Sequence, residues 1–186
     1  MTDIEFKAFD KIARLNREVI VTEKIDGTNG VIFVGDDFTT FRAGSRSRWV
    51  TPGDDNFGFA AWAEANREEL IKGLGPGYHY GEWWGAGIQR RYGLAEKRFS
   101  LFNVSRWGDV ATRPACCHVV PELARGLDIR EVVERALTTL RTGGSVAAQG
   151  FMKPEGIVAF HTAAGALFKV TLEKDEAPKG VTNKGA

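Results

Sequence analysis

Two lysines and two glutamates stand in sequence surroundings where charged side chains add little to folding. Lys24 ends an apolar, β-branched run, and Lys169 lies inside a second apolar run. Glu82 is surrounded by aromatic residues, and Glu155 directly precedes an apolar segment. Two buried lysine–glutamate pairs would contribute little net stability, so a purely structural use of all four is a weak explanation. A lysine nucleophile, a second cation and two carboxylates suit nucleotidyl transfer through lysine.

The requirements of that reaction fit the other residues. Lys24 must be neutral before its amine attacks phosphorus, and a second cation such as Lys169, with a divalent metal, disfavours the charged form. The phosphate and its leaving group carry several negative charges, which arginine, lysine and the metal would neutralise. A purine base needs an aromatic face, which Phe102 or Phe99 could supply.

The segment around Lys24 has a simpler explanation as well. Asp26-Gly27 lies between two strand-like runs, and Asp-Gly is a strong hairpin-turn signal. A turn needs nothing beyond Asp-Gly, whereas Lys24, Thr28 and Asn29 also crowd around it. A functional loop is therefore weighed beside the hairpin turn.

A basic loop, Gly44-Ser45-Arg46-Ser47-Arg48, follows another predicted strand. Arginines in such loops are usually solvated, but two arginines among glycine and serine also suit a phosphate-binding loop. If the segment is extended, Arg46 and Arg48 point to one side and line the same anionic path.

The chain resembles the ATP-dependent RNA ligases, a branch of the covalent nucleotidyltransferase superfamily that also includes DNA ligases and mRNA capping enzymes. Asn29 favours the RNA branch, because DNA ligases tend to carry arginine there. The matching motifs stand in the family's order: Lys24-Ile-Asp-Gly-Thr-Asn29, Ser45-Arg46, Gly81-Glu82-Trp-Trp-Gly85, Phe99-Ser-Leu-Phe102, Glu155-Gly-Ile-Val-Ala and Leu167-Phe-Lys169-Val.

The resemblance implies three catalytic residues. Lys24 would form the covalent Lys-AMP bond, Lys169 would contact the α-phosphate, and Glu155 would bind Mg²⁺ or Mn²⁺. ATP would be the substrate of this step.

The resemblance also implies the binding residues. Glu23 and Phe102 would bind adenine, while Arg46 and Glu82 would hold the ribose, with Arg46 also near phosphate. Lys24, Lys169 and Asn29 complete the nucleotide site. Asn29 would also place the nucleic-acid ends, and we expect Arg48 to contact the strand.

The implied reaction has three steps: Lys24 takes AMP from ATP, passes it to a 5′-phosphate, and a 3′-hydroxyl displaces AMP. The partners would be RNA ends or a nicked duplex. Thr171 stands where the fifth motif often has a second lysine, and no appended domain follows, so an accessory protein could supply RNA affinity. The alternatives are a DNA-joining or capping-type enzyme, or a non-sealing nucleotide- or nucleic-acid-binding relative.

Composition sets outer limits. The chain has 186 residues, 43% hydrophobic and 26% charged, with a formal net charge of +1, so a nucleic-acid surface must be a local patch. We expect one nucleotidyltransferase domain over 1–172 and a loose tail over 173–186. Neither a bilayer-spanning run nor a leader is seen, which indicates a cytoplasmic protein. Cys116 and Cys117 are adjacent and give no metal-ligand spacing.

The periodicity predicts an α+β fold, with two mainly antiparallel sheets, flanking helices and a nucleotide groove between the sheets. Residues 3–17 are expected to be an extended entry followed by a helical turn. Helices are predicted at 57–72 and 128–141, a hairpin at 30–35 and 38–43, and further strands at 78–85, 98–104, 117–120, 154–160 and 166–172.

Overall fold

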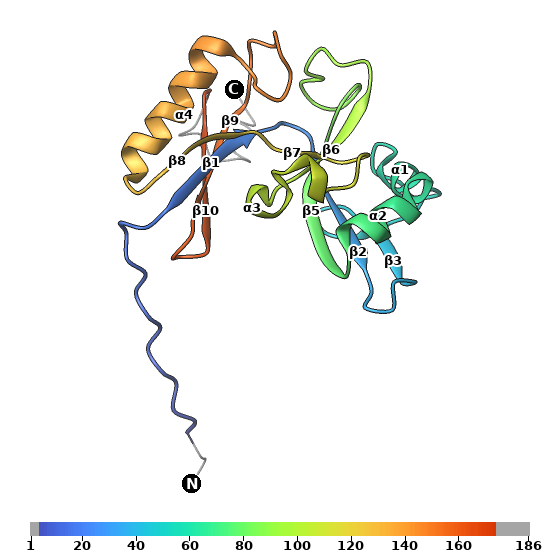
Figure 1. The fold of residues 1–186 in the computed structure, drawn as a ribbon, viewed down its shortest axis with the longest axis horizontal. Helices are drawn as coiled ribbons and strands as arrows, with labels where there is room; N and C mark the ends of the chain where they lie inside the picture. Colours follow the sequence, from blue (N-terminus) through green and yellow to red (C-terminus); the bar gives the residue numbers. More distant parts are fainter. Residues whose placement is uncertain (1–3, 174–186) are drawn as a thin grey trace, which may run out of the picture.

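The computed structural model describes residues 4–173, whose strands form two sheets that lie side by side (Figure 1). Sheet A has four strands in the order β10-β9-β1-β8, and sheet B has six in the order β4-β3-β2-β5-β6-β7. Neighbouring strands are antiparallel except for β6 and β7, which are parallel. The α+β fold with two mainly antiparallel sheets is thereby confirmed. The tail expected over 173–186 lies, from residue 174 onward, outside the described residues.

The strands run over the following residues. Sheet A contains β1 (Val19–Lys24), β8 (Glu122–Gly126), β9 (Gly156–His161) and β10 (Ala166–Thr171). Sheet B contains β2 (Thr28–Val34), β3 (Phe41–Gly44), β4 (Trp49–Val50), β5 (Gly77–Gly85), β6 (Lys97–Leu101) and β7 (His118–Val119).

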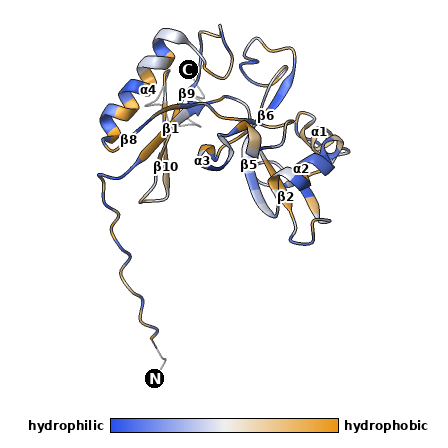
Figure 2. Ribbon diagram, in the orientation of Figure 1, coloured by the Kyte–Doolittle hydropathy of each residue, from blue (hydrophilic) through white to orange (hydrophobic). Residues whose placement is uncertain are grey.

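Helix α4 (Ile129–Gly143) covers one face of sheet A, and Figure 2 shows hydrophilic and hydrophobic bands alternating along it. Its apolar side chains, such as Leu137 and Leu140, pack with Val19 and Val21 of β1 in one buried cluster. The Asp128 carboxylate accepts hydrogen bonds from the first backbone N–H groups of the helix, as an N-cap does. The helix predicted at 128–141 is thus confirmed, with its cap.

Helices α1 (Phe59–Ala65) and α2 (Arg67–Leu74) cover sheet B where one helix was predicted at 57–72. The break falls at Asn66, whose backbone leaves the helical region and whose side-chain amide donates to the Trp62 carbonyl. Asparagine competes in this way with the helical hydrogen-bond ladder. Two short helices, α3 (Val104–Trp107) and a 3₁₀ turn (Val110–Thr112), lie between β6 and β7.

Three sequence predictions need correction. The strand predicted at 98–104 ends at Leu101, because α3 begins directly afterwards at Val104. Strand β8 was not predicted at all. Residues 4–14 form neither helix nor strand and extend away from the two sheets, so the helical turn expected within 3–17 is absent from the described part of that segment (Figure 1). No helix among residues 4–173 combines the length and the apolar character needed to cross a bilayer.

The hairpin alternative for the segment around Asp26-Gly27 is wrong. Strand β1 pairs with β8 and β9 in sheet A, whereas β2 pairs with β3 and β5 in sheet B, so residues 25–27 pass from one sheet to the other. A Cβ atom at Gly27 would lie 2.5 Å from the Trp83 carbonyl oxygen and 2.7 Å from the Trp84 Cβ. Glycine is required here because the backbone runs tightly against β5.

Substituting Gly27→Ala should therefore destabilise the protein. The added methyl group meets backbone rather than the end of a flexible side chain, so relief requires movement of β5, and overpacking of this kind costs about 1–3 kcal/mol. Urea unfolding would measure the loss. Gly53→Ala is the matched control, since a Cβ there meets no atom within 4 Å. Equal stability of the two variants would contradict the close packing at Gly27.

Candidate active site

A groove of about 510 Å³ lies between the two sheets. Residues that line it come from both: Glu23, Lys24 and Lys169 from sheet A, Asn29 and Glu82 from sheet B, and Arg46 and Phe102 from loops beside sheet B. A second hollow of about 500 Å³ on the outer side of α4 is lined only by residues of that helix. The groove between the sheets is thus the site in which the chemically capable side chains meet.

Lys24 stands at the end of β1 and forms an ion pair with Glu155. Lys24 Nζ lies 2.6 Å from Glu155 Oε2, and the two side chains are 21% and 9% exposed. The pairing register of β1 with β9 places Lys24 opposite Gly156, which brings the preceding Glu155 to the lysine. The predicted nucleophile and the predicted metal-binding carboxylate are therefore direct neighbours.

Glu82 is the buried carboxylate on the sheet B side of the groove. Its Oε1 accepts a hydrogen bond from the Gly27 N–H at 3.0 Å, and its Oε2 accepts one from Asn29 Nδ2 at 3.3 Å. Burial raises the pKa of Glu82 to about 7, and the carboxylates of Glu155 and Asp26 add to the rise, while Lys24 and the Gly27 N–H oppose it. Near neutral pH this group is therefore poised between its two protonation states.

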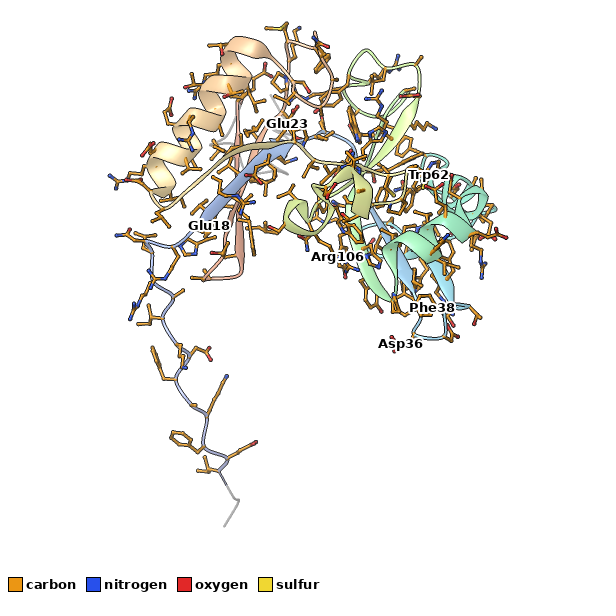
Figure 3. All side chains as sticks on the ribbon, viewed as in Figure 1. Glu18, Glu23, Asp36, Phe38, Trp62 and Arg106 are labelled. Carbon is orange, nitrogen blue, oxygen red and sulfur yellow. The ribbon has the colours of Figure 1, made fainter. Side chains whose placement is uncertain are left out.

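Glu23, predicted to bind adenine, directs its side chain away from the groove. Neighbouring residues of a strand point to opposite faces, so Glu23 and Lys24 diverge. Its carboxylate accepts hydrogen bonds from Ser145 Oγ at 2.6 Å and from the N–H groups of Val146 and Ala147 at 2.8 and 2.9 Å. Figure 3 labels Glu23 near the end of β1, and the residue is only 1% exposed. What Glu23 presents to the groove is therefore main chain.

Burial raises the pKa of Glu23, while its hydrogen bonds with Ser145, Ala147 and Val146 oppose that rise. The carboxylate holds the loop that follows α4 against β1. This structural use of Glu23 is one that its position beside Lys24 does not reveal.

Asp26 is fixed by residues that sequence reasoning missed. Arg90 Nε lies 3.0 Å from Asp26 Oδ2, and Arg90 Nη1 also donates to the Lys153 carbonyl. The Asp26 N–H donates to the Tyr92 hydroxyl at 2.7 Å. Burial raises the pKa of the Tyr92 hydroxyl, which stays protonated at neutral pH. No pattern around Arg90 or Tyr92 pointed to the site, because their segment has no strand or helix periodicity.

The choice between the two phenylalanines has a geometric answer. Phe99 is fully buried among Phe59 and Trp62 in the core beneath sheet B, whereas Phe102 lines the groove and is 40% exposed. The strand ends between them, at Leu101. Of these two residues, it is Phe102 that offers a ring to a ligand in the groove.

The apolar residues around Lys169 in the sequence suggested a buried side chain, but the structure shows an exposed one. Lys169 lies on β10 and lines the groove. Among residues 4–173 it forms no ion pair, so its ammonium group is available to an anion in the groove.

Arg46 and Arg48 do not lie on an extended segment. The Ser45 N–H donates to the Arg48 carbonyl at 2.8 Å, which closes a turn between β3 and β4. Arg46, at the tip of this turn, lines the groove. Arg48 instead pairs with Asp54, with Nη1 2.6 Å from Oδ2. The turn separates the two arginines that the sequence analysis placed on one path.

Glu155 is the carboxylate predicted to hold a divalent metal at this groove. No group of three histidine, cysteine, aspartate or glutamate side chains capable of holding a metal occurs in the described part of the chain. Mg²⁺ is commonly bound through one or two carboxylates together with substrate phosphates and water. Glu155 beside the groove fits that arrangement, with the remaining ligands supplied by a bound phosphate.

The raised pKa of Glu82 predicts a pH-dependent stability. The folded protein binds this proton more tightly than the unfolded chain, so the free energy of unfolding falls as pH rises from about 4.5 to about 7. Glu82→Gln cannot titrate and should lack this component. Relative to the variant, the wild type should lose up to about 3 kcal/mol across that window, at about 1.4 kcal/mol per pKa unit.

Urea unfolding of both proteins at steps from about pH 4.5 to about pH 7.5 measures this difference, and the titration of Glu23 cancels because both proteins share it. A constant difference across the window would mean that folding does not shift the pKa of Glu82.

Comparisons with known proteins agree with this geometry. No curated protein matches the sequence. The fold is similar to solved structures of Naegleria gruberi RNA ligase: a mutant with AMP and Mn has a TM-score of 0.64 at 20% identity, and a mutant with ATP and Mn has 0.62 at 22%. Both matches cover 84% of this chain and 50% of the other, so the chain spans about half the length of these relatives. The family model described as RNA ligase matches residues 17–171, and the chain therefore belongs to the RNA ligase family.

Proposed function

We propose that the chain is an ATP-dependent RNA ligase that joins 5′-phosphate and 3′-hydroxyl ends through a covalent lysyl-AMP at Lys24. The observation that carries the proposal is one groove in which Lys24, Glu82 and Lys169 meet, with Glu155 paired to Lys24, in a member of the RNA ligase family. The Naegleria structures, which contain ATP or AMP with Mn, support a nucleotide and a divalent metal as ligands of the same groove.

In the first step the Lys24 amine forms a bond with the α-phosphorus of ATP, and the bond to the pyrophosphate oxygen breaks. Lys24 must first give up a proton and leave its 2.6 Å contact with Glu155. Lys169, exposed in the groove without an ion pair among residues 4–173, is suited to neutralise the α-phosphate. A divalent metal at Glu155 would supply further neutralisation of phosphate charge.

The remaining nucleotide contacts follow from which groups face the groove. Phe102 is proposed to stack on adenine, with the main chain of Glu23 nearby. Glu82 is proposed to accept a hydrogen bond from a ribose hydroxyl, with Arg46 close to ribose or phosphate. Asn29 already donates to Glu82, so it is placed to connect the nucleotide with the strand end.

The strand contacts and the surroundings of the reaction are proposals as well. Arg48 would have to exchange Asp54 for a phosphate, since the two are paired at 2.6 Å. RNA ends or a nicked duplex are the proposed substrates, and an accessory protein is proposed to add RNA affinity. We also propose a cytoplasmic location.

Lys24→Ala should abolish covalent labelling by ATP radiolabelled at the α-phosphate, because it removes the amine that is proposed to bond to the α-phosphorus. Intact mass after incubation with ATP and Mg²⁺ should show one adenylyl group on the wild type and none on the variant. Lys72→Ala, which removes an exposed lysine on α2, is the control and should keep full labelling. Labelling that persists in Lys24→Ala would refute the assignment of the nucleophile.

Phe102→Ala should weaken ATP binding about 5- to 150-fold, the equivalent of the roughly 1–3 kcal/mol that base stacking on an aromatic ring contributes. Phe102→Tyr keeps the ring and should bind ATP as the wild type does. Titration calorimetry with Lys24→Ala as the background protein avoids turnover during the measurement. If Phe102→Ala binds ATP unchanged, adenine lies elsewhere in the groove.

A further inference from the structure

Sheet B has an open face that carries exposed aromatic rings. Phe33 of β2, Trp49 of β4, and Tyr78 and Tyr80 of β5 form what we call the aromatic face. Trp49, Tyr78 and Tyr80 are 41%, 56% and 57% exposed, and Phe33 is half-buried. Helices α1 and α2 pack on the opposite face, against residues such as Ile32. Contiguous exposed rings of this kind mark interaction surfaces more often than structural ones.

The register of sheet B joins the aromatic face to the groove. Along β5, Tyr78, Tyr80 and Glu82 are alternate residues, and alternate residues share one face of a sheet. On β2, Asn29 pairs with Glu82, Val31 with Tyr80, and Phe33 with Tyr78. The first pair that includes an aromatic residue, Val31–Tyr80, therefore lies two residues along the strands from the Asn29–Glu82 pair, a distance of about 7 Å. The same two strands carry the groove residues and the rings.

The rings form a stacked surface rather than separate side chains. Tyr78 and Tyr80 have centroids 6.2 Å apart and planes within 12°, and Trp49 and Tyr78 have centroids 6.3 Å apart and planes within 24°. The centroid of the Phe33 ring lies 4.7 Å from that of the Tyr78 ring. A Cβ at Gly44 would lie 3.1 Å from Trp49 Cε3, so the glycine lets the indole lie across β3. The backbone is thus adapted to a flat ring at this position.

Two arginines border the aromatic face, at opposite ends of it. The Arg42 guanidinium lies 5.9 Å from the centroid of the Trp49 ring, and Arg46 lies at the tip of the turn that leads into Trp49. Asp36 belongs to the turn between β2 and β3, at the far end of sheet B (Figure 3). Arg42 pairs with Phe33 and so lies in the Phe33–Tyr78 row, at the end of the aromatic face away from the groove, whereas Arg46 lines the groove. Arginines at both ends of the rings suit a polyanion that runs from the groove across the aromatic face.

We propose that the aromatic face is a stacking platform for unpaired bases of the RNA strand whose end is joined in the groove. Open sheet faces bind single-stranded RNA in this way, with bases stacked on rings from neighbouring strands and phosphates near arginines. Bases within a duplex are stacked on one another and have no free face for these rings. The platform therefore assigns the substrate class: an RNA end that carries a single-stranded stretch.

This inference rests on the proposed function for its link to joining, but RNA binding alone can test it. Fluorescence anisotropy of a short labelled single-stranded RNA, measured without ATP at fixed salt, gives the affinity. Tyr80→Ala and Trp49→Ala should each weaken binding about 5- to 150-fold, the range for the loss of one stacked base. Binding of a fully paired RNA duplex should change little in the same variants.

Substitutions at Tyr80 separate a ring from mere apolar area. Tyr80→Phe should bind single-stranded RNA as the wild type does, whereas Tyr80→Leu should bind as weakly as Tyr80→Ala. Phe168→Ala is the matched control, because Phe168 is also about half exposed but lies on β10, next to the groove-lining Lys169 and therefore on the opposite face of that strand. Unchanged melting temperatures would show that the variants are folded.

Several outcomes would overturn the platform. They are wild-type protein that binds no single-stranded RNA, ring variants with wild-type affinity, or Tyr80→Leu as strong a binder as Tyr80→Phe. If Tyr80→Leu binds as strongly as Tyr80→Phe, the face is an apolar docking surface for protein. The same conclusion would follow if sedimentation showed that the alanine variants lose self-association but keep RNA binding.

Self-adenylation separates this inference from the proposed function, because none of the rings lines the groove. Ring variants should label with ATP at the wild-type level. Wild-type protein that binds RNA through these rings but takes no label from ATP would contradict the proposed function and support the platform. Full labelling with no effect of the rings on RNA binding would contradict the platform alone.

Discussion

The passage of the backbone at Gly27 against β5 is the constraint on which the groove depends. Residue 27 has room for no side chain, since a Cβ would meet backbone of Trp83 at 2.5 Å. This contact brings the Gly27 N–H to Glu82 and sets where β2 starts. Lys24 on sheet A and Asn29 on sheet B consequently face each other across the groove, although few residues separate them. Close packing at Gly27 thus determines which side chains meet in the groove.

Three buried glutamates near that passage have different binding partners. Glu23 binds the loop after α4, Glu155 binds Lys24, and Glu82 binds the backbone and side chain at the start of β2. Each is satisfied by hydrogen bonds or an ion pair, as burial of a carboxylate requires. Glu82 and Glu155 remain at the edge of the groove, where a ligand can replace the present partners. Glu23 does not, and its role is to hold structure together.

The groove residues were predictable because chemistry demands charged side chains in apolar surroundings, and such residues stand out in a sequence. Lys24, Glu82 and Lys169 were found in this way. Strand alternation beside Lys24 could also have shown that the Glu23 side chain faces away.

Other features had no adequate local signal. Asp26-Gly27 is compatible with both a hairpin and a change of sheet, and the pairing of β1 with distant strands decides between them. Arg90, Tyr92 and Ser145 reach the site only through tertiary packing. The turn at Arg46 likewise depends on the pairing of β3 with β4. Strand β4 has only two residues, which is too short for a recognisable strand pattern in the sequence.

The interleaving of the two sheets has a consequence for how the chain acquires its groove. Sheet B is formed by a continuous stretch from β2 to β7. The pairing partners of β1 in sheet A, β8 and β9, come from much later in the sequence. Lys24 and Glu155 are 131 positions apart. Because distant pairings form slowly and chains emerge from the ribosome N-terminus first, sheet B is able to fold while β1 has no neighbour. The strand that carries Lys24 is made early and is among the last to be held in place.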